Sequence, residues 1–189
     1  MLNFKELFVA SYKELKNLRS LTLAAMLGAV SIVLGMLAVF PTPSVKVTFA
    51  FLPNEFVYYL FGPVLGAAYG AILDILTYIV KPMGAFFPGL TLSAVLTGLL
   101  YGIFLYKRPL SIRRIFVVNV ISTVFISILL NTYWMSVLRG TSFMVELPFR
   151  AIKAIVMLPI ETIMLYVLVK GVEATGILKG FHNRSQKLS

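Results

Sequence analysis

The strongest constraint in this sequence is the segment from Ile115 to Leu138, which contains no charged side chain. A helix needs about 20 mostly apolar residues to cross the hydrocarbon core of a bilayer. The chain as a whole is also apolar, because 59% of its residues are hydrophobic and 13% are charged. Typical soluble domains have about 25% charged residues. A chain of 189 residues cannot hide so much apolar surface from water. We therefore predict an all-α integral membrane protein.

Six segments are predicted to be transmembrane helices. They are Leu21–Phe40, Phe51–Phe61, Val64–Val80, Thr91–Tyr106, Ile115–Leu138 and Pro148–Val169. The second is short, and Gly62 and Pro63 separate it from the third. Because this dipeptide interrupts helices, we expect a compact hairpin here rather than one long helix. The alternation of polar and apolar residues over 44–50 indicates an extended loop.

The whole chain, 1–189, is interpreted as a single membrane domain. Residues 1–20 mix basic and acidic side chains with apolar ones, which is typical of an amphipathic segment on the membrane surface. Residues 21–170 are the expected six-helix bundle, and residues 171–189 a basic cytoplasmic tail. The first apolar run is longer than the core of a signal peptide, so we expect no cleaved signal.

Lysine and arginine are concentrated on one side of the predicted spans. Because such residues favour the cytoplasmic side, both termini are predicted to be cytoplasmic. The cations left on the outer side are Lys46, Lys81, Arg139, Arg150 and Lys153. The net charge of +10 is then a consequence of membrane orientation, and no nucleic-acid partner is expected.

The sequence offers little for catalysis or metal binding. It has no cysteine, and its one histidine, His182, lies in the polar tail. Disulfides and thiolate metal sites are excluded, and a Ser-His-Asp triad is disfavoured. The phosphate-binding pattern G-x-x-x-x-G-K-[ST] is absent, as are H-E-x-x-H and G-x-S-x-G. We expect no catalytic residue, metal, cofactor or ATPase activity in this chain.

Small residues recur every four positions in two of the predicted spans. They are Gly62, Gly66 and Gly70, followed by Asp74, in one, and Ala94, Gly98 and Gly102 in the other. Small side chains let helix backbones approach closely within a membrane, so the pattern predicts a packing seam.

The outer cations are candidates for binding an anionic ligand. Arg150 and Lys153 are three residues apart and therefore share one face of the last span. With Lys46 and Lys81 they offer charge-assisted hydrogen bonds to carboxylates. The alternative is that these side chains reach toward lipid headgroups.

Acidic residues inside apolar segments are costly and are functional candidates. Asp74 is expected to accept two parallel hydrogen bonds from the edge of a flat heterocycle, or to pair with Lys153 or Lys81. Glu55, which follows Pro53, is interpreted as a helix cap, and Glu161 as an internal hydrogen-bonding residue.

Aromatic residues gather at the same outer end. Phe86 and Phe87 lie in an outer loop, and Asn131, Tyr133 and Trp134 lie near the outer end of the fifth span. Such residues often anchor a helix at the membrane interface. They also provide rings on which a flat ligand stacks, with Asn131 as a polar neighbour.

Several stretches resemble the substrate-binding S component of an energy-coupling factor (ECF) vitamin transporter. They are Ala25–Ala29, Leu60–Asp74, Lys81–Ser93, Leu100–Gly102 and Leu158–Glu161. The resemblance covers roughly residues 20–170. Lys81–Ser93, with its Phe-Phe-Pro-Gly-Leu-Thr-Leu-Ser sequence, is similar to the folate branch in particular.

The resemblance implies a multi-pass protein of a prokaryotic plasma membrane that binds a vitamin, expected to be folate, from outside. It also implies a transmembrane coupling protein and two cytoplasmic ATPases as partners, and toppling of the S component during transport. Ala25 and Ala29 match the A-x-x-x-A pattern that contacts the coupling protein.

Three alternatives remain at this point. The first is an S component for another vitamin: riboflavin, thiamine, a queuosine precursor or pantothenate. The second is a membrane-embedded enzyme that acts on lipid. The third is a structural subunit without a ligand.

Overall fold

The computed structural model describes residues 4–37, 39–42, 45–82 and 84–175. Its elements in chain order are α1 (Phe4–Leu15), α2 (Leu18–Met36), β1 (Val39–Thr42), β2 (Val45–Val47), α3 (Phe51–Val80), α4 (Pro88–Leu105), α5 (Ile112–Ile121), the π-helix η1 (Ser122–Leu130), α6 (Asn131–Arg139) and α7 (Phe143–Ala174). The described part of the chain is thus helical apart from one short hairpin, and the all-α prediction is confirmed at this level.

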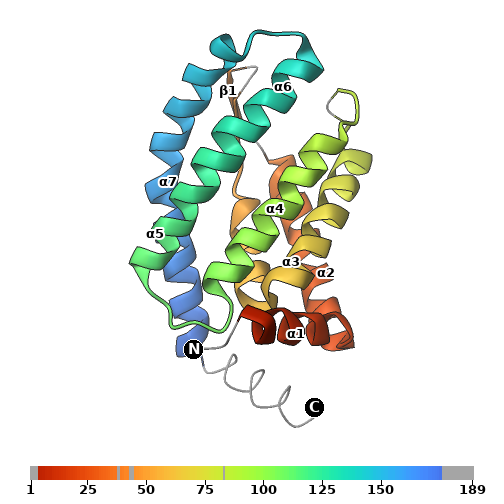
Figure 1. Cartoon of the computed structure of the whole chain (residues 1–189), viewed down its shortest axis with the longest axis vertical. Coiled ribbons are helices and arrows are strands. Elements are labelled where there is room, and N and C mark those ends of the chain that lie inside the picture. The colour runs from red at the N-terminus through yellow and green to blue at the C-terminus, as the bar shows by residue number, and fades with distance from the viewer. Residues whose placement is uncertain (1–3, 38, 43–44, 83, 176–189) are drawn as a thin grey trace.

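Long apolar helices dominate the molecule. Within the described residues, five are long and apolar enough to cross a membrane: Leu18–Met36, Phe51–Val80, Pro88–Leu105, Ile112–Arg139 and Arg150–Ala174. The fourth comprises α5, η1 and α6, which run on without a break beside α7 (Figure 1). Large apolar side chains such as Ile79, Phe125 and Ile155 are exposed. Lipid is the solvent that makes such exposure favourable.

The helix α3 folds back on itself at Gly62. This glycine has a φ of 82° and a ψ of −167°, which interrupts the helical backbone. The hydroxyl group of Tyr69 donates a hydrogen bond of 2.9 Å to the amide oxygen of Asn54. In a straight helix, residues so separated would lie about 22 Å apart along the axis. The hairpin expected at Gly62 and Pro63 is therefore confirmed.

The first helix, α1, packs against this reversal. Ser11 of α1 is fully buried, and its hydroxyl donates to the carbonyl of Phe61 at 2.7 Å. The same oxygen accepts the backbone N–H of Val64 at 2.9 Å. Asn17 then begins α2, because its side chain accepts the N–H of Arg19 and caps the new helix. Residues 4–15 thus form a separate helix that crosses one end of the molecule (Figure 1).

The second arm of α3 packs tightly against α4. A Cβ atom added at Gly70 would lie 2.6 Å from the carbonyl oxygen of Ala94, and one at Gly66 would lie 3.0 Å from that of Gly98. Side chains at these positions would force the two backbones apart. The predicted small-residue seam is confirmed.

Several expected boundaries differ from the observed ones by up to five residues, and two of these lie at prolines. The first span was expected to reach Phe40, but α2 ends at Met36 and Val39–Thr42 forms a strand that pairs antiparallel with Val45–Val47. The prolines Pro41 and Pro43 exclude a helix here, and backbone pairing takes its place. The last span was expected to begin at Pro148, but α7 begins at Phe143 and includes that proline. Pro148 has no N–H group to donate to the carbonyl of Met144, four residues earlier. Because Met144 lies at the start of α7, only one hydrogen bond of the first turns is lost and the helix can include the proline.

The core lies toward the end of the molecule that α1 crosses. It includes the buried side chains of Val57, Leu65, Leu105, Ile115 and Val169. These come from α3, α4, α5 and α7, which converge at that end (Figure 1). The packed core leaves the opposite half of the bundle as the place where a cavity opens.

Candidate ligand-binding site

A cavity of about 490 Å³ lies between α2, α3, α4, η1, α6 and α7. Its volume falls within the range of about 300–1,000 Å³ that small-molecule sites occupy. Apolar wall residues include Ile32, Leu90, Met135 and Met157, and hydroxyl groups come from Thr97, Ser122 and Ser127. Ser122 and Ser127 belong to the π-helical stretch, a departure from α-helix that is frequent at functional sites.

Four of the five predicted outer cations line this cavity. Lys81 caps the end of α3, Arg139 ends α6, and Arg150 and Lys153 lie in the first turns of α7. Their elements meet at the end of the molecule opposite α1 (Figure 1). The cations predicted from separate parts of the sequence are thus brought together. The side chain of the fifth, Lys46, lies outside the described residues.

Asp74 also lines the cavity, from the seam-bearing arm of α3. It is half-buried, and its Oδ2 atom accepts a hydrogen bond of 2.7 Å from the hydroxyl of Thr91 at the start of α4. The bond holds the carboxylate at the junction of the two helices. Its other oxygen leaves capacity for further donors.

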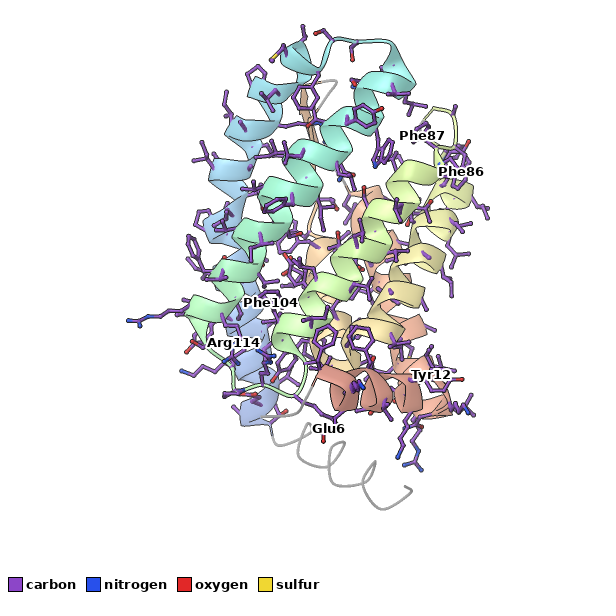
Figure 2. All side chains as sticks on the ribbon, in the orientation of Figure 1. Glu6, Tyr12, Phe86, Phe87, Phe104 and Arg114 are labelled. Atoms are coloured by element: carbon purple, nitrogen blue, oxygen red, sulfur yellow. The ribbon has the colours of Figure 1, made fainter. Side chains whose placement is uncertain are left out.

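Two aromatic pairs lie at the cation-rich end. Phe86 and Phe87 line the cavity, and they lie at the end opposite Tyr12 and Arg114 (Figure 2). The Phe86 ring meets Tyr78 edge-on at 5.3 Å, and the Phe87 ring lies 5.5 Å from that of Trp134. Both contacts fix ring orientation.

Trp134 and Asn131 belong to α6. They are not part of the cavity wall in the described part of the chain. Trp134 packs on Phe87 and against Gly89, where an added Cβ atom would lie 2.6 Å from the indole ring. Asn131 lies three residues earlier, at the start of α6. Trp134 supports the Phe87 ring, and direct ligand contact by Trp134 or Asn131 stays a prediction.

Comparison with known proteins identifies the family. Residues 19–178 match the model of the family described as the ECF transporter, substrate-specific component. The chain belongs to this family. The resemblance found in the sequence is therefore confirmed, and the protein is a multi-pass membrane component of a transporter.

Relatives and a solved structure agree with this assignment. The S component is 34% identical over 125 residues to the "Folate transporter FolT" of Clostridium novyi, covering 66% of this chain and 73% of that protein. It is 31% identical over 149 residues to the "Folate transporter FolT" of Leuconostoc mesenteroides, covering 76% and 80%. The structure described as "FolT bound with folic acid" superposes with a TM-score of 0.74 at 31% identity, covering 80% of this chain and 93% of that one.

Two acidic residues of the S component line the cavity although neither was predicted as a site residue. Glu55 was expected to cap a helix, but Ala50 occupies the N-cap position and Glu55 is buried in the cavity wall. Glu161 lines the cavity from α7. The signal that singled out Asp74, an acid within an apolar segment, applies equally to both.

A second, apolar pocket, called here the apolar hollow, lies on the surface of the S component between α2 and α3. It has a volume of about 340 Å³ and apolar walls. Ala25 and Ala29 are exposed and lie on its border together with Gly28 and Ile72. The two alanines predicted to contact a partner are therefore on the surface, where a small side chain leaves room for another helix.

Proposed function

We propose that this chain is the folate-binding S component of an ECF importer. The observation that carries the proposal is its similarity, over 93% of the other chain, to a structure described as bound with folic acid. The two relatives named as folate transporters support it from sequence. The chain captures folate outside the cell and delivers it inward when it is coupled to separate ATPase subunits.

The cavity has the chemistry that folate requires. Folate combines a 2-amino-4-oxo pteridine, an aromatic middle and a glutamate with two carboxylates. The glutamate carboxylates meet the cations Lys81, Arg150 and Lys153, because cations form their strongest hydrogen bonds with carboxylates. Lys46 is a further candidate from the sequence alone. Phe86 and Phe87, the latter packed against Trp134, enclose the aromatic middle, and Asn131 is a further candidate for a ligand contact. Asp74 offers an acceptor for N–H groups of the ligand.

The topology we propose has six membrane crossings with both termini in the cytoplasm. In this topology the two arms of α3 on either side of Gly62 count as separate crossings, so that the five long helices give six. This orientation puts the cation-lined mouth of the cavity outside and α1 inside. Residues 1–189 form one membrane domain, with 21–170 as the bundle and 171–189 as the cytoplasmic tail.

The partners we propose are a transmembrane coupling protein and two cytoplasmic ATPases in a prokaryotic plasma membrane. The chain then needs no nucleotide site of its own. Exposed Ala25 and Ala29, on the border of the apolar hollow along α2, form the surface for the coupling protein.

Ligand titration of the purified protein tests the proposal. Folic acid, riboflavin, thiamine and pantothenate are titrated calorimetrically into the protein in detergent, and any copurifying small molecule is identified by mass spectrometry. We expect saturable binding of folic acid alone. Saturation by another vitamin, with none by folic acid, would overturn the proposal.

A further inference from the structure

Glu55 combines deep burial with an oxygen that no residue of the described chain engages. The side chain is 4% exposed and belongs to the cavity wall. Its Oε1 atom accepts a hydrogen bond of 3.1 Å from the hydroxyl of Tyr101. Its Oε2 atom is buried and has no hydrogen-bond partner among the described residues. A buried carboxylate oxygen without a donor is costly, so a donor supplied by a ligand would be strongly favoured.

A buried polar network holds this carboxylate in place. With the Asn119 amide oriented so that each atom has a suitable partner, its nitrogen donates to the Tyr101 hydroxyl at 2.8 Å and its oxygen accepts from the Thr162 hydroxyl at 3.0 Å. The single proton of Tyr101 is then available for Glu55. The network joins α3, α4, α5 and α7. Glu55 is therefore a positioned acceptor in the wall of the cavity.

The cavity is also polarised along its length. On α7, Glu161 lies eleven residues after Arg150, roughly 16 Å further from the cation-rich end. Glu55 lines the same cavity as Glu161, and its Tyr101 neighbour lies in the half of α4 away from Phe87. Cations thus mark one end of the cavity, while the carboxylates of Glu55 and Glu161 lie toward the other.

We propose that Glu55 recognises the donor edge of the pteridine ring, which enters the cavity first. The exocyclic amino group and the adjacent ring N–H donate to the Glu55 carboxylate, and the glutamate tail remains at the cation-rich mouth. Asp74, already engaged by Thr91 and closer to that mouth, then serves the middle of the ligand. This assignment rests on the proposed function and names the residue that makes the site selective for an amino-substituted heterocycle.

Three ligands separate the ring from the tail in a binding test. Folic acid, a pterin without the tail, and p-aminobenzoylglutamate without the ring are titrated into the wild-type protein and Glu55→Gln. We expect Glu55→Gln to weaken folic acid and the pterin by a similar factor, about tenfold or more, because an acceptor oxygen is replaced by an amide donor that faces the donor edge of the ring. Binding of p-aminobenzoylglutamate is expected to stay unchanged.

The matched control is Glu173→Gln. Glu173 also accepts a tyrosine hydroxyl, that of Tyr59 at 2.9 Å, but it is exposed near the end of α7. This variant is expected to bind all three ligands as the wild type does. Asp74→Asn is compared in the same titrations and is expected to weaken folic acid more than the pterin.

The outcomes distinguish the inference from the proposed function. Unchanged affinity of Glu55→Gln for the pterin, or an equal loss for all three ligands, would overturn the role of Glu55, as would a pterin-specific loss in Asp74→Asn alone. Failure of the wild type to bind folic acid would overturn the proposed function instead.

If Glu55→Gln does not fold, Tyr101→Phe replaces it. Removing the donor of Glu55 is expected to change pterin affinity at least about threefold without affecting p-aminobenzoylglutamate, and no change would overturn the inference.

Discussion

The hydroxyl group of Tyr69 donates a hydrogen bond to the side chain of Asn54, fifteen residues earlier in the same helical element. The bond exists because the backbone reverses at Gly62, and the Tyr58 ring packs edge-on against Tyr69 at 5.9 Å across the reversal. The reversal places Glu55 and Asp74, from the two arms of α3, around one cavity. A single glycine therefore organises both the helical hairpin and the candidate site.

We predict that Gly62→Ala destabilises the protein by about 2–4 kcal/mol, since a left-handed φ is unfavourable for alanine and overpacking adds to the cost. An added Cβ atom would lie 2.6 Å from the Tyr106 ring. Gly84→Ala is the control, because Gly84 has a φ of 91° but no atom within 4 Å of the added Cβ. Denaturant unfolding in detergent measures both variants. Equal losses in the two would mean that the contact with Tyr106 is unimportant.

We predict that Ser11→Ala lowers the free energy of unfolding by about 1–3 kcal/mol, because it leaves buried backbone groups around the reversal without partners. The hydroxyl of Ser11 bonds Phe61, Val64 and Leu65. Ser136→Ala, which removes a local and exposed bond to the carbonyl of Tyr133, is expected to have little effect. Thermal unfolding provides the measurement. A Ser11 variant as stable as the wild type would contradict the role of α1 in closing the hairpin.

We predict that Arg150→Gln and Lys153→Gln each weaken folic acid about tenfold or more, because both remove a charged donor to the ligand carboxylates. The affinity for a pterin without the glutamate tail should change much less. Lys170→Gln is the control on the same helix, since Lys170 lies over the Tyr166 ring far from the cavity. Calorimetric titration measures both affinities. An equal loss of affinity for folic acid and for the pterin would contradict binding of the ligand carboxylates by Arg150 and Lys153.

We predict that Ala25→Leu and Ala29→Leu abolish folate uptake while leaving folate binding unchanged. Both alanines are exposed, so a larger side chain blocks close approach of a partner helix without disturbing the cavity. Ala174→Leu, another exposed alanine near the end of α7, is expected to leave uptake intact. Uptake of labelled folate by cells that contain the complete transporter is compared with binding to the purified variants. Normal uptake by the Ala25 and Ala29 variants would exclude this surface as the coupling site.

Much of the helical plan could be predicted from the sequence because it depends on neighbours in the chain. Apolar runs identified the long helices, the Gly62-Pro63 pair identified the reversal, and the four-residue spacing of glycines identified the seam. Boundaries near prolines were less reliable. Whether Pro148 ends a helix or lies within its early turns depends on tertiary contacts that the local sequence does not show.

The sequence by itself determined the membrane class, the family and the gathering of cations at one end, since polarity and spacing are local properties. Only the tertiary structure decided which acids face the cavity and which aromatic rings pack on one another. Glu55 meets Tyr101 across 46 residues, and Trp134 reaches Phe87 from a different helix. The rotation of each helix about its axis is fixed by packing against distant helices. For that reason Glu55 became visible as a candidate ligand residue only in the folded protein.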